Sequence, residues 1–405
     1  MTTVEEATRL VLSTVRALPT EVLPLPDTLG RVLRQAVTAD RDFPPFNRVA
    51  MDGIALHYEA IAQGQTQFEV VGMQFAGQAP TPLSDPATTL EIMTGAMLPP
   101  GADTVVRYED VDIQEQPDGR RVATVRVLPP NAGHNVHTQA SDRHQDDELL
   151  PVGTVLGPAE VAVAATVGAT HLTVSQRPHV AVVSTGDELV ELDQAPLPYQ
   201  IRRSNSYMLQ AAVWQAGGRA EQFHFNDDPD ALRQGLPPLL HQYDAVLLSG
   251  GVSMGKADFL PAALAEAGVE QLFHGVRQRP GKPFWFGQHP QGAVVFALPG
   301  NPVSTFVNYC RYAAPWLRAV QQPTLPQPAP TFATLTTKVV FRPPVTHFLL
   351  VSLYSAPDGR LLATPERAHG SGDLASLLPS SGFLELPAEQ AEFPAGMVLP
   401  VWRFR

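Results

Sequence analysis

Apolar runs and amphipathic segments alternate along the chain between residues 177 and 320. Four short runs have the length of strands, and they are HVAVVSTG (179–186), RAEQFHF (219–225), YDAVLLSGG (243–251) and GAVVFALPG (292–300). Longer segments with helical spacing follow them at 204–218, 227–242, 258–268 and 301–320, and the first opens on a serine N-cap and stops at glycine. This alternation of buried strands and helices predicts a parallel sheet covered on both faces.

The flanking regions have other patterns. Residues 1–40 read as two helices, an amphipathic one at the start and a second over LPDTLGRVLRQAV (25–37), and residues 158–168 read as a short apolar helix. From about 66 to 150 the pattern is that of strands, with a hairpin at the Asp-Gly turn of 117–120. After a proline-rich linker at 321–330, several short strands predict a small all-β domain.

Composition narrows the class of protein. The chain has 405 residues, 44% of them hydrophobic, which predicts a globular protein of several domains. Its net charge of −12 argues against a general nucleic-acid binder, which needs a basic face.

The start of the chain lacks the pattern of a signal peptide, and no apolar run is long enough for a membrane span, so we expect a cytoplasmic protein. The single cysteine, Cys310, reads as a small buried hydrophobe.

Three predicted strands run into polar loops that contain glycine, at 184–189, 248–259 and 297–304. Loops at the carboxyl ends of parallel strands face one crevice, where ligands bind. In the last loop Pro299 and Pro302 stiffen a corner that Gly300 opens, so the following N–H groups, near Asn301, can point at an oxyanion. One such loop alone reads as a turn, but three in one sheet indicate a site. The loops match neither of the standard nucleotide motifs.

Charged residues suggest what this site binds. Arg279 and Lys282 lie in the proline-fixed segment RQRPGKPFWFG (277–287), where their positive charges favour an oxyanion clamp over the alternative of a solvated basic turn. Glu188, Asp228 and Asp258 stand at strand ends or helix starts, and carboxylates beside a bound phosphate favour Mg²⁺. The neighbouring Asp227 reads as a helix cap.

Eight motifs, taken together and in order, give the chain a resemblance to a known family. They are FPPFNRVAMDGIAL (43–56), IMTGAMLPPGADTVV (92–106), STGDELV (184–190), SNSYML (204–209), NDDP (226–229), LSGGVSMGKADF (248–259), RPGKPFWFG (279–287) and LPGNPVS (298–304). The chain resembles the MoeA family of molybdopterin molybdenumtransferases, which includes the gephyrin E domain, over almost its whole length. The resemblance implies an enzyme that takes adenylylated molybdopterin and molybdate, needs Mg²⁺, releases AMP and forms the molybdenum cofactor.

The resemblance also implies an architecture. Relatives are elongated homodimers of four subdomains whose active cleft uses both chains, and the molybdopterin adenylyltransferase is a possible partner. For this chain it implies an N-terminal helical domain (1–45 and 141–176), an inserted β-rich domain (46–140), a molybdopterin-binding, MogA-like α/β domain (177–325) and a C-terminal β-barrel (326–405).

The site residues of the family are assigned to this chain by matching the motifs. The resemblance implies catalytic roles for Asp52, Thr94, Asp142, Glu188, Asp228 and Asp258, and it puts the last three near the metal and the nucleotide phosphate. Asp52 and Thr94 are expected to reach the partner's cleft. Residues implied to meet the substrate are Asn205, Gly250, Gly251, Ser253, Arg279, Lys282, Pro299, Asn301, Pro302 and Ser371.

The chain departs from the family pattern at two places. Where relatives carry arginines before an acid, this chain has His137 and Thr138, with Asp142 in the place of the acid, and at the start of the C-terminal barrel it has Thr346 and His347. Lost arginines weaken anion binding. A second hypothesis is therefore a molybdopterin-binding paralogue or scaffold with altered catalysis. A third is another enzyme on the α/β domain, such as the adenylyltransferase of this pathway or a CinA-like amidase, although that needs little beyond residues 177–320.

Overall fold

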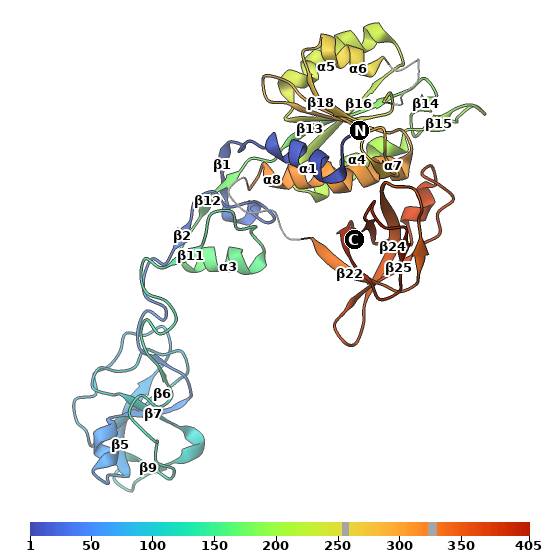
Figure 1. Cartoon of the computed structure of the whole chain (residues 1–405). Coiled ribbons are helices and arrows are strands. Elements are labelled where there is room, and N and C mark those ends of the chain that lie inside the picture. The colour runs from blue at the N-terminus through green and yellow to red at the C-terminus, as the bar shows by residue number, and fades with distance from the viewer. Residues whose placement is uncertain (253–258, 323–329) are drawn as a thin grey trace. The chain divides into compact units, whose positions relative to one another are not determined.

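The structure is a computed structural model that describes residues 1–252, 259–322 and 330–405 (Figure 1). The chain forms two compact units. One comprises residues 1–23, 30–34 and 173–405, and the other comprises residues 24–29 and 35–172.

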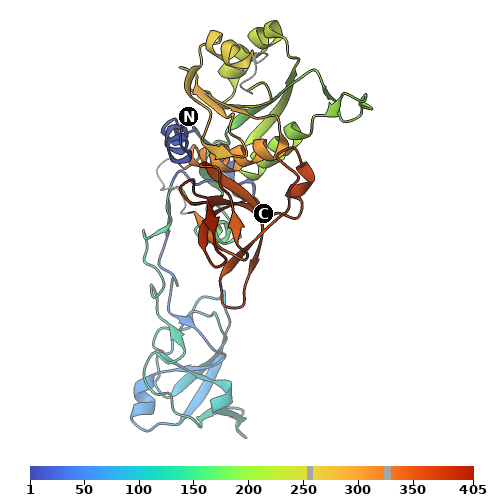
Figure 2. The ribbon, with the colours of Figure 1, turned by 45° about the vertical axis from the view of Figure 1, so that its right-hand side comes forward.

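A six-stranded mixed sheet forms the centre of the first unit (Figures 1 and 2). Its strands lie in the order β16 (Arg219–Phe225), β13 (His179–Thr185), β17 (Ala245–Ser249), β21 (Val294–Leu298), β20 (Trp285–Gln288) and β18 (Glu270–His274). The first four are parallel, which confirms the predicted parallel sheet. β17 and β21 are buried at every position, as expected for strands covered on both faces.

Two strands at one end of the sheet, β20 and β18, were not predicted. β20 pairs antiparallel with β21, and β18 pairs antiparallel with β20. The sequence reading treated residues 277–287 as a loop, because prolines and glycines dominate its first half. The second half, beginning at Phe284, instead buries Trp285 and Phe286 in the sheet, so a basic loop leads directly into β20, which lies between β21 and the edge strand β18.

Helices cover both faces of this sheet. On one face lie α1 (Val4–Ser13), α4 (Ser204–Gln215), α7 (Pro302–Asn308) and α8 (Ala314–Ala319), with the π-helical turn Tyr309–Ala313 between α7 and α8. The other face carries α5 (Pro229–Gln242) and α6 (Leu260–Glu266). The division into four domains stays a prediction, but α1 packs its buried face, Val4, Ala7 and Val11, into the core of the α/β sheet.

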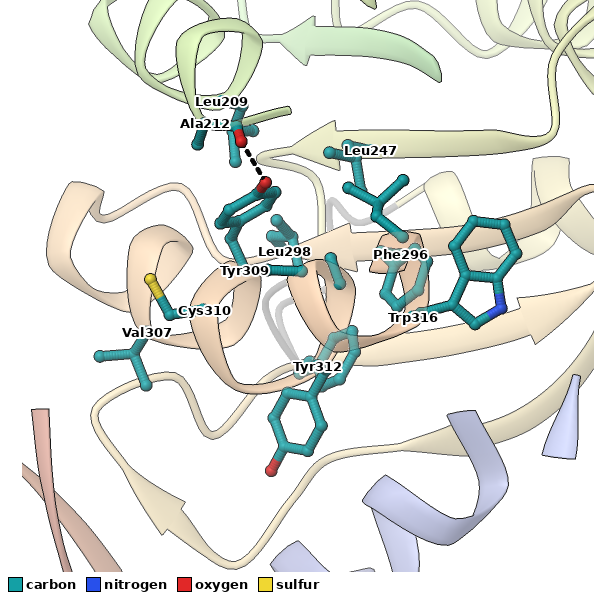
Figure 3. Packing of buried hydrophobic residues seen from close by; sticks show 14 of the residues in the cluster. Leu209, Ala212, Leu247, Phe296, Leu298, Val307, Tyr309, Cys310, Tyr312 and Trp316 are labelled. Atoms are coloured by element: carbon teal, nitrogen blue, oxygen red, sulfur yellow. Dashed lines mark hydrogen bonds between the residues drawn. The ribbon is translucent and has the colours of Figure 1, made fainter. Parts of the chain in front are cut away.

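The core on the α4 side is rich in aromatic side chains (Figure 3). Phe296 of β21 lies 5.9 Å from Trp316 of α8, measured between ring centroids. Tyr309 donates a 2.6 Å hydrogen bond from its hydroxyl to the carbonyl oxygen of Ala212. Cys310 is buried here, as predicted, and burial raises the pKa of its thiol. The cysteine is therefore a packing residue.

The ends of α4 are partly as predicted. Gly217 has φ +84°, and the N–H of Gly218 reaches the carbonyl oxygen of Val213 at 2.9 Å, which confirms the glycine stop. The predicted serine N-cap is wrong. Arg203 occupies the N-cap position and makes no side-chain capping bond.

Residues 330–405 form a closed β-barrel. Its strands are β22 (Thr331–Leu335), β24 (Thr346–Ser355), β25 (Leu361–Pro365), β26 (Gly382–Leu386) and β28 (Val398–Arg403). Pairing of β24 with both β25 and β26 closes the ring, so every barrel strand has two neighbours. The short β19 (Gln278–Arg279) adds to β24 in parallel and brings the basic segment to the barrel. The predicted linker at 321–330 lies mostly outside the described residues.

The second unit contains another six-stranded sheet, which confirms the predicted strands. Their order is β7 (Thr104–Arg107), β4 (Gly53–Leu56), β6 (Thr88–Ile92), β5 (Gln67–Gln74), β9 (Arg121–Val125) and β8 (Val111–Glu115). β8 and β9 form the hairpin predicted at the Asp-Gly turn. The predicted helix at 158–168 is α3 (Pro158–Thr166).

The predicted helix over residues 25–37 is wrong. Only the 3₁₀ turn η1 (Leu25–Asp27) forms there, followed by irregular chain and β2 (Val37–Thr38). Gly30 has φ +72°, a left-handed conformation that ends any helix. Leu33 instead forms an isolated bridge with Val174.

The remaining elements are short. They are β1 (Thr20–Pro24), β3 (Arg48–Val49), α2 (Tyr58–Ala62), η2 (Tyr108–Asp110), β10 (Val136–His137), β11 (Glu148–Leu150), β12 (His171–Ser175), β14 (Leu189–Val190), β15 (Ile201–Arg202), β23 (Val339–Val340), η4 (Leu374–Leu377) and β27 (Glu392–Phe393).

Candidate functional site

Two adjoining pockets lie at the carboxyl ends of the parallel strands. The first has a volume of about 730 Å³ and is lined by residues that follow β13, β17 and β21, among them Glu188, Gly251 and Pro299. The second, about 580 Å³, is lined by the basic segment 278–283 and by residues of the barrel. Pro283, Pro299 and Asn301 line both pockets. The three glycine-containing loops therefore meet at one site, as predicted.

The corner at 299–302 joins the two pockets. The Thr305 hydroxyl donates to the carbonyl oxygens of Pro299, at 2.5 Å, and Asn301, at 3.1 Å. The Asn301 side-chain amide donates to the Ser371 hydroxyl at 3.0 Å, and the Val303 N–H donates to the Ser371 carbonyl oxygen at 3.0 Å. The corner is thus fixed both to its own helix and to the barrel.

Asn205 holds the loops together. Its Nδ2 donates to the Ser249 hydroxyl at 2.8 Å and to the Gly300 carbonyl oxygen at 2.7 Å, and lies 3.3 Å from the Thr305 hydroxyl. One side chain in the first turn of α4 therefore connects the ends of β17 and β21.

The paired glycines after β17 allow a close approach. Gly250 has φ +106°, and a Cβ there would lie 2.9 Å from the Thr185 hydroxyl oxygen and 3.0 Å from the Thr185 carbonyl oxygen. Gly251 has φ +67°, and its Cβ would lie 3.2 Å from the same hydroxyl. Only glycine combines this backbone conformation with this spacing. The predicted Ser253 and Asp258, and Lys256 of the same loop, lie outside the described residues.

The basic segment is positioned by a buried polar network. Gln278 donates to the Asn308 side-chain oxygen at 2.7 Å and accepts from the Tyr312 hydroxyl at 2.6 Å. Asn308 in turn donates to the Gly281 carbonyl oxygen at 3.1 Å. This network fixes the backbone between Arg279 and Lys282, whose side chains are exposed and line the second pocket.

Thr346 and His347, the two residues at the start of the barrel that depart from the family pattern, both contact the basic segment. The His347 ring lines the second pocket, stacks on Phe341 at 4.1 Å between centroids, and has Nδ1 3.0 Å from the Arg279 carbonyl oxygen. Burial lowers the pKa of His347 and outweighs the hydrogen bond to the Arg279 carbonyl oxygen, which raises it. The charge of Arg279 lowers the pKa further, so the net shift favours the neutral ring at pH 7. Thr346 is buried and donates its N–H to the Arg277 carbonyl oxygen at 3.0 Å.

The acids are arranged differently from the prediction. Glu188 lines the first pocket, as does Asp227, which the sequence reading assigned as a helix cap. The cap is Asp228, whose carboxylate accepts from the Asp230 N–H at 3.1 Å. The N-cap residue of α5 needs an extended backbone directly before Pro229, and Asp228 has it. The sequence alone does not show which of the two adjacent acids, Asp227 or Asp228, takes this position. Within the described residues, no group of three His, Cys, Asp or Glu side chains forms a metal site.

Asp52 and Thr94 form a separate polar site in the second unit. The Asp52 carboxylate accepts hydrogen bonds from the Thr94 N–H and hydroxyl, both at 2.7 Å, and these bonds lower the pKa of Asp52. The next residue must be glycine, because a Cβ at Gly53 would lie 2.0 Å from the Val106 carbonyl oxygen. Asp142, in the same unit, is exposed and accepts from the Ser141 hydroxyl at 3.2 Å.

Sequence reasoning missed several residues of the first pocket. Arg202, Arg203, Thr185 and Ser206 all line it. Thr185 and Ser206 lie inside the motifs STGDELV and SNSYML but were not assigned a role, and Arg202 and Arg203 lie directly before SNSYML. The arginine pair directly before SNSYML was the one available indication.

The fold and the site define a class of protein. It is a multidomain α/β protein whose polar pocket at the strand ends is joined to a basic pocket beside a β-barrel. Family models match in three regions. Residues 2–168 match the MoeA N-terminal region (domain I and II), residues 181–319 a probable molybdopterin-binding domain, and residues 333–404 the MoeA C-terminal region (domain IV).

Relatives match over most of the chain. A molybdopterin molybdenumtransferase from Synechocystis sp. is 37% identical over 92% of this chain and 92% of its own, and one from Bacillus subtilis is 30% identical over 99% and 94%. The crystal structure of a molybdopterin biosynthesis MoeA protein from Pyrococcus horikoshii OT3 superposes with a TM-score of 0.83 at 26% identity, covering 100% of both chains. The chain belongs to the MoeA family, whose curated relatives are transferases.

In the part of the chain that the structure describes, no helix is both long and apolar enough to cross a membrane.

Proposed function

We propose that this chain is a molybdenum insertase, which takes adenylylated molybdopterin and molybdate, releases AMP and forms the molybdenum cofactor. The single observation that carries the proposal is the pair of pockets joined at the 299–302 corner, one lined by acids and the other by Arg279 and Lys282. The relatives support it, because they are named molybdopterin molybdenumtransferases.

The second pocket suits a tetrahedral dianion. Arg279 and Lys282 line it with charged donors, and Ser371, which also lines it, supplies a hydroxyl. Such donors are already in place before the ligand arrives, because the Gln278–Asn308 network holds the backbone that carries them. We assign molybdate, as substrate, to this pocket.

The first pocket suits the phosphoanhydride. Its glycine loop lets the backbone approach the ligand closely, while Glu188 and Asp227 supply carboxylate oxygens. Two carboxylates completed by substrate phosphates and water are a donor set that magnesium accepts, and magnesium bound there would neutralise charge on the phosphates. Asp258 remains a predicted third acid. The chain's own residues orient the phosphates and hold the leaving AMP.

The proposal includes a homodimer. Asp52 and Thr94 form an anionic, exposed group on the second unit, and we assign it to the cleft of the partner subunit. This assignment follows the family pattern stated above.

The direct test is incubation of the purified protein with adenylylated molybdopterin, Mg²⁺ and molybdate, with AMP measured by chromatography. We expect AMP release that depends on molybdate. Absence of AMP with all three present contradicts the proposal.

A second candidate is a molybdopterin-binding scaffold without turnover. The neutral His347 and the backbone-bonded Thr346 favour it, because they stand where relatives carry arginine. Calorimetric binding of the adenylylated pterin without AMP release identifies this alternative. An adenylyltransferase reading is disfavoured, because it leaves residues 2–168 and 333–404 without a role.

A further inference from the structure

The first turn of α4 faces the first pocket without a cap. Arg203 to Ser206 line the pocket, and Arg203 at the N-cap position makes no side-chain bond to the turn. A helix of 12 residues presents unpaired N–H groups and the positive end of its dipole at such a terminus. These are the groups that bind phosphate in many proteins.

Buried side chains around this turn also lack partners. The Nε of Arg203, the hydroxyl of Thr185 and the hydroxyl of Ser206 have no hydrogen-bond partner among the described residues. These residues are 9%, 5% and 0% exposed, and all three line the pocket. Buried polar groups are normally paired, so three unpaired donors around one pocket indicate a ligand that accepts hydrogen bonds.

The guanidinium of Arg203 is held in a fixed orientation. Its Nη2 is paired with the half-exposed carboxylate of Glu191. This leaves the Nε–H free, and the residue is buried enough for its charge to be weakly screened. Thr185 lies against Gly250 and Gly251, so its hydroxyl is next to the glycine loop.

We propose that Arg203, Thr185, Ser206 and the first turn of α4 form a phosphate subsite, which binds the phosphoryl group on the nucleotide side of the substrate. The inference rests on the proposed function and deepens it, because it assigns one part of the substrate to one part of the pocket. Arg203 is then a specificity-determining residue that the motif-based prediction did not include.

The test compares AMP with adenosine, which lacks the phosphate, in calorimetric titrations of the full chain. We expect the wild-type protein to bind AMP about tenfold or more tightly than adenosine. Arg203→Lys keeps a charge but removes the Nε–H, and Ser206→Ala removes one hydroxyl. Both substitutions should weaken AMP binding severalfold and leave adenosine binding unchanged.

Arg233→Met is the matched control, since Arg233 is an exposed arginine on α5 paired with Glu266 and Asp230 and lines neither pocket. It should bind AMP as the wild type does. Equal affinities for AMP and adenosine in the wild type overturn the inference, as do wild-type AMP affinities in both pocket variants. Failure of AMP release in the turnover assay, with phosphate-dependent AMP binding intact, would instead count against the proposed function alone.

Discussion

The carboxylate of Asp52 is exposed, yet it is held firmly by two hydrogen bonds from Thr94. These bonds favour the charged form and lower the pKa of Asp52, so the group stays ionised well below neutral pH. A fixed charge on the surface of a β domain contributes little to stability. Its orientation therefore suggests a role toward a ligand or a partner subunit.

We predict that Asp52→Ala leaves the fold intact and lowers AMP release by about 100-fold or more. Asp52→Asn, which keeps the shape and loses the charge, should be similarly impaired. Circular dichroism and thermal melting check the fold, and the turnover assay checks activity. Unfolding of the alanine variant would mean that Asp52 is structural.

Lys282 is one of three lysines in the chain, and it lines the basic pocket. We predict that Lys282→Ala raises the molybdate concentration needed for half-maximal activity by about 10- to 100-fold, because a charge-assisted hydrogen bond is lost. Lys338→Ala is the control, since Lys338 pairs with Glu392 on the barrel and lines neither pocket. An unchanged molybdate requirement in Lys282→Ala removes the residue from the site.

His347 gives the basic pocket a pH dependence. The folded protein lowers the pKa of His347 below the ordinary value of 6.5, because burial outweighs the hydrogen bond to the Arg279 carbonyl oxygen and the charge of Arg279 acts in the same direction as burial. Lys282 and Glu366 also line the pocket. As pH falls below about 6.5, the unfolded chain takes up a proton that the folded chain does not, so stability decreases. We predict a smaller loss between about pH 7.5 and 5.5 in His347→Gln, measured by urea unfolding. An identical pH profile contradicts this.

At the scale of elements, the site depends on how strand ends meet helix starts. β17 ends in Gly250 and Gly251 against Thr185 of β13, and β21 ends in the corner that begins α7. Both glycines have a positive φ and lie against Thr185, whereas their predicted contact with the ligand stays a prediction. The cap of α5 and the start of α4 were predicted wrongly, because single residues decide a cap and the apolar periodicity is unchanged by a shift of one position.

We predict that Gly250→Ala destabilises the protein by at least about 1 kcal/mol more than Gly359→Ala. Both glycines have positive φ, but a Cβ at Gly359 meets nothing within 4 Å, whereas one at Gly250 meets Thr185. The difference between the two losses in unfolding free energy therefore measures the close approach of Gly250 to Thr185 and not the cost of the backbone conformation. Chemical denaturation provides both values, and equal losses would show that the contact with Thr185 relaxes freely.

At the scale of the whole molecule, the site residues are divided between two compact units. The proposed function brings them together through a second copy of the chain. We predict a homodimer by light scattering in solution. Co-expressed Asp52→Ala and Lys282→Ala chains should regain activity, because a mixed dimer contains one cleft with neither defect. A monomer that is active contradicts the assignment of Asp52 to the partner.

The parallel strands, their helices, both β regions and the loops of the site could be predicted from local patterns, because burial imposes a period on apolar residues and turns require glycine and proline. Gly250 and Asn301 in those loops could be named in advance. Three features could not be predicted in this way: Trp285 and Phe286 extend the sheet, Asp227 and not Asp228 lines the pocket, and Arg203 is buried beside it. Each of these depends on contacts between segments far apart in the chain, which no local pattern records.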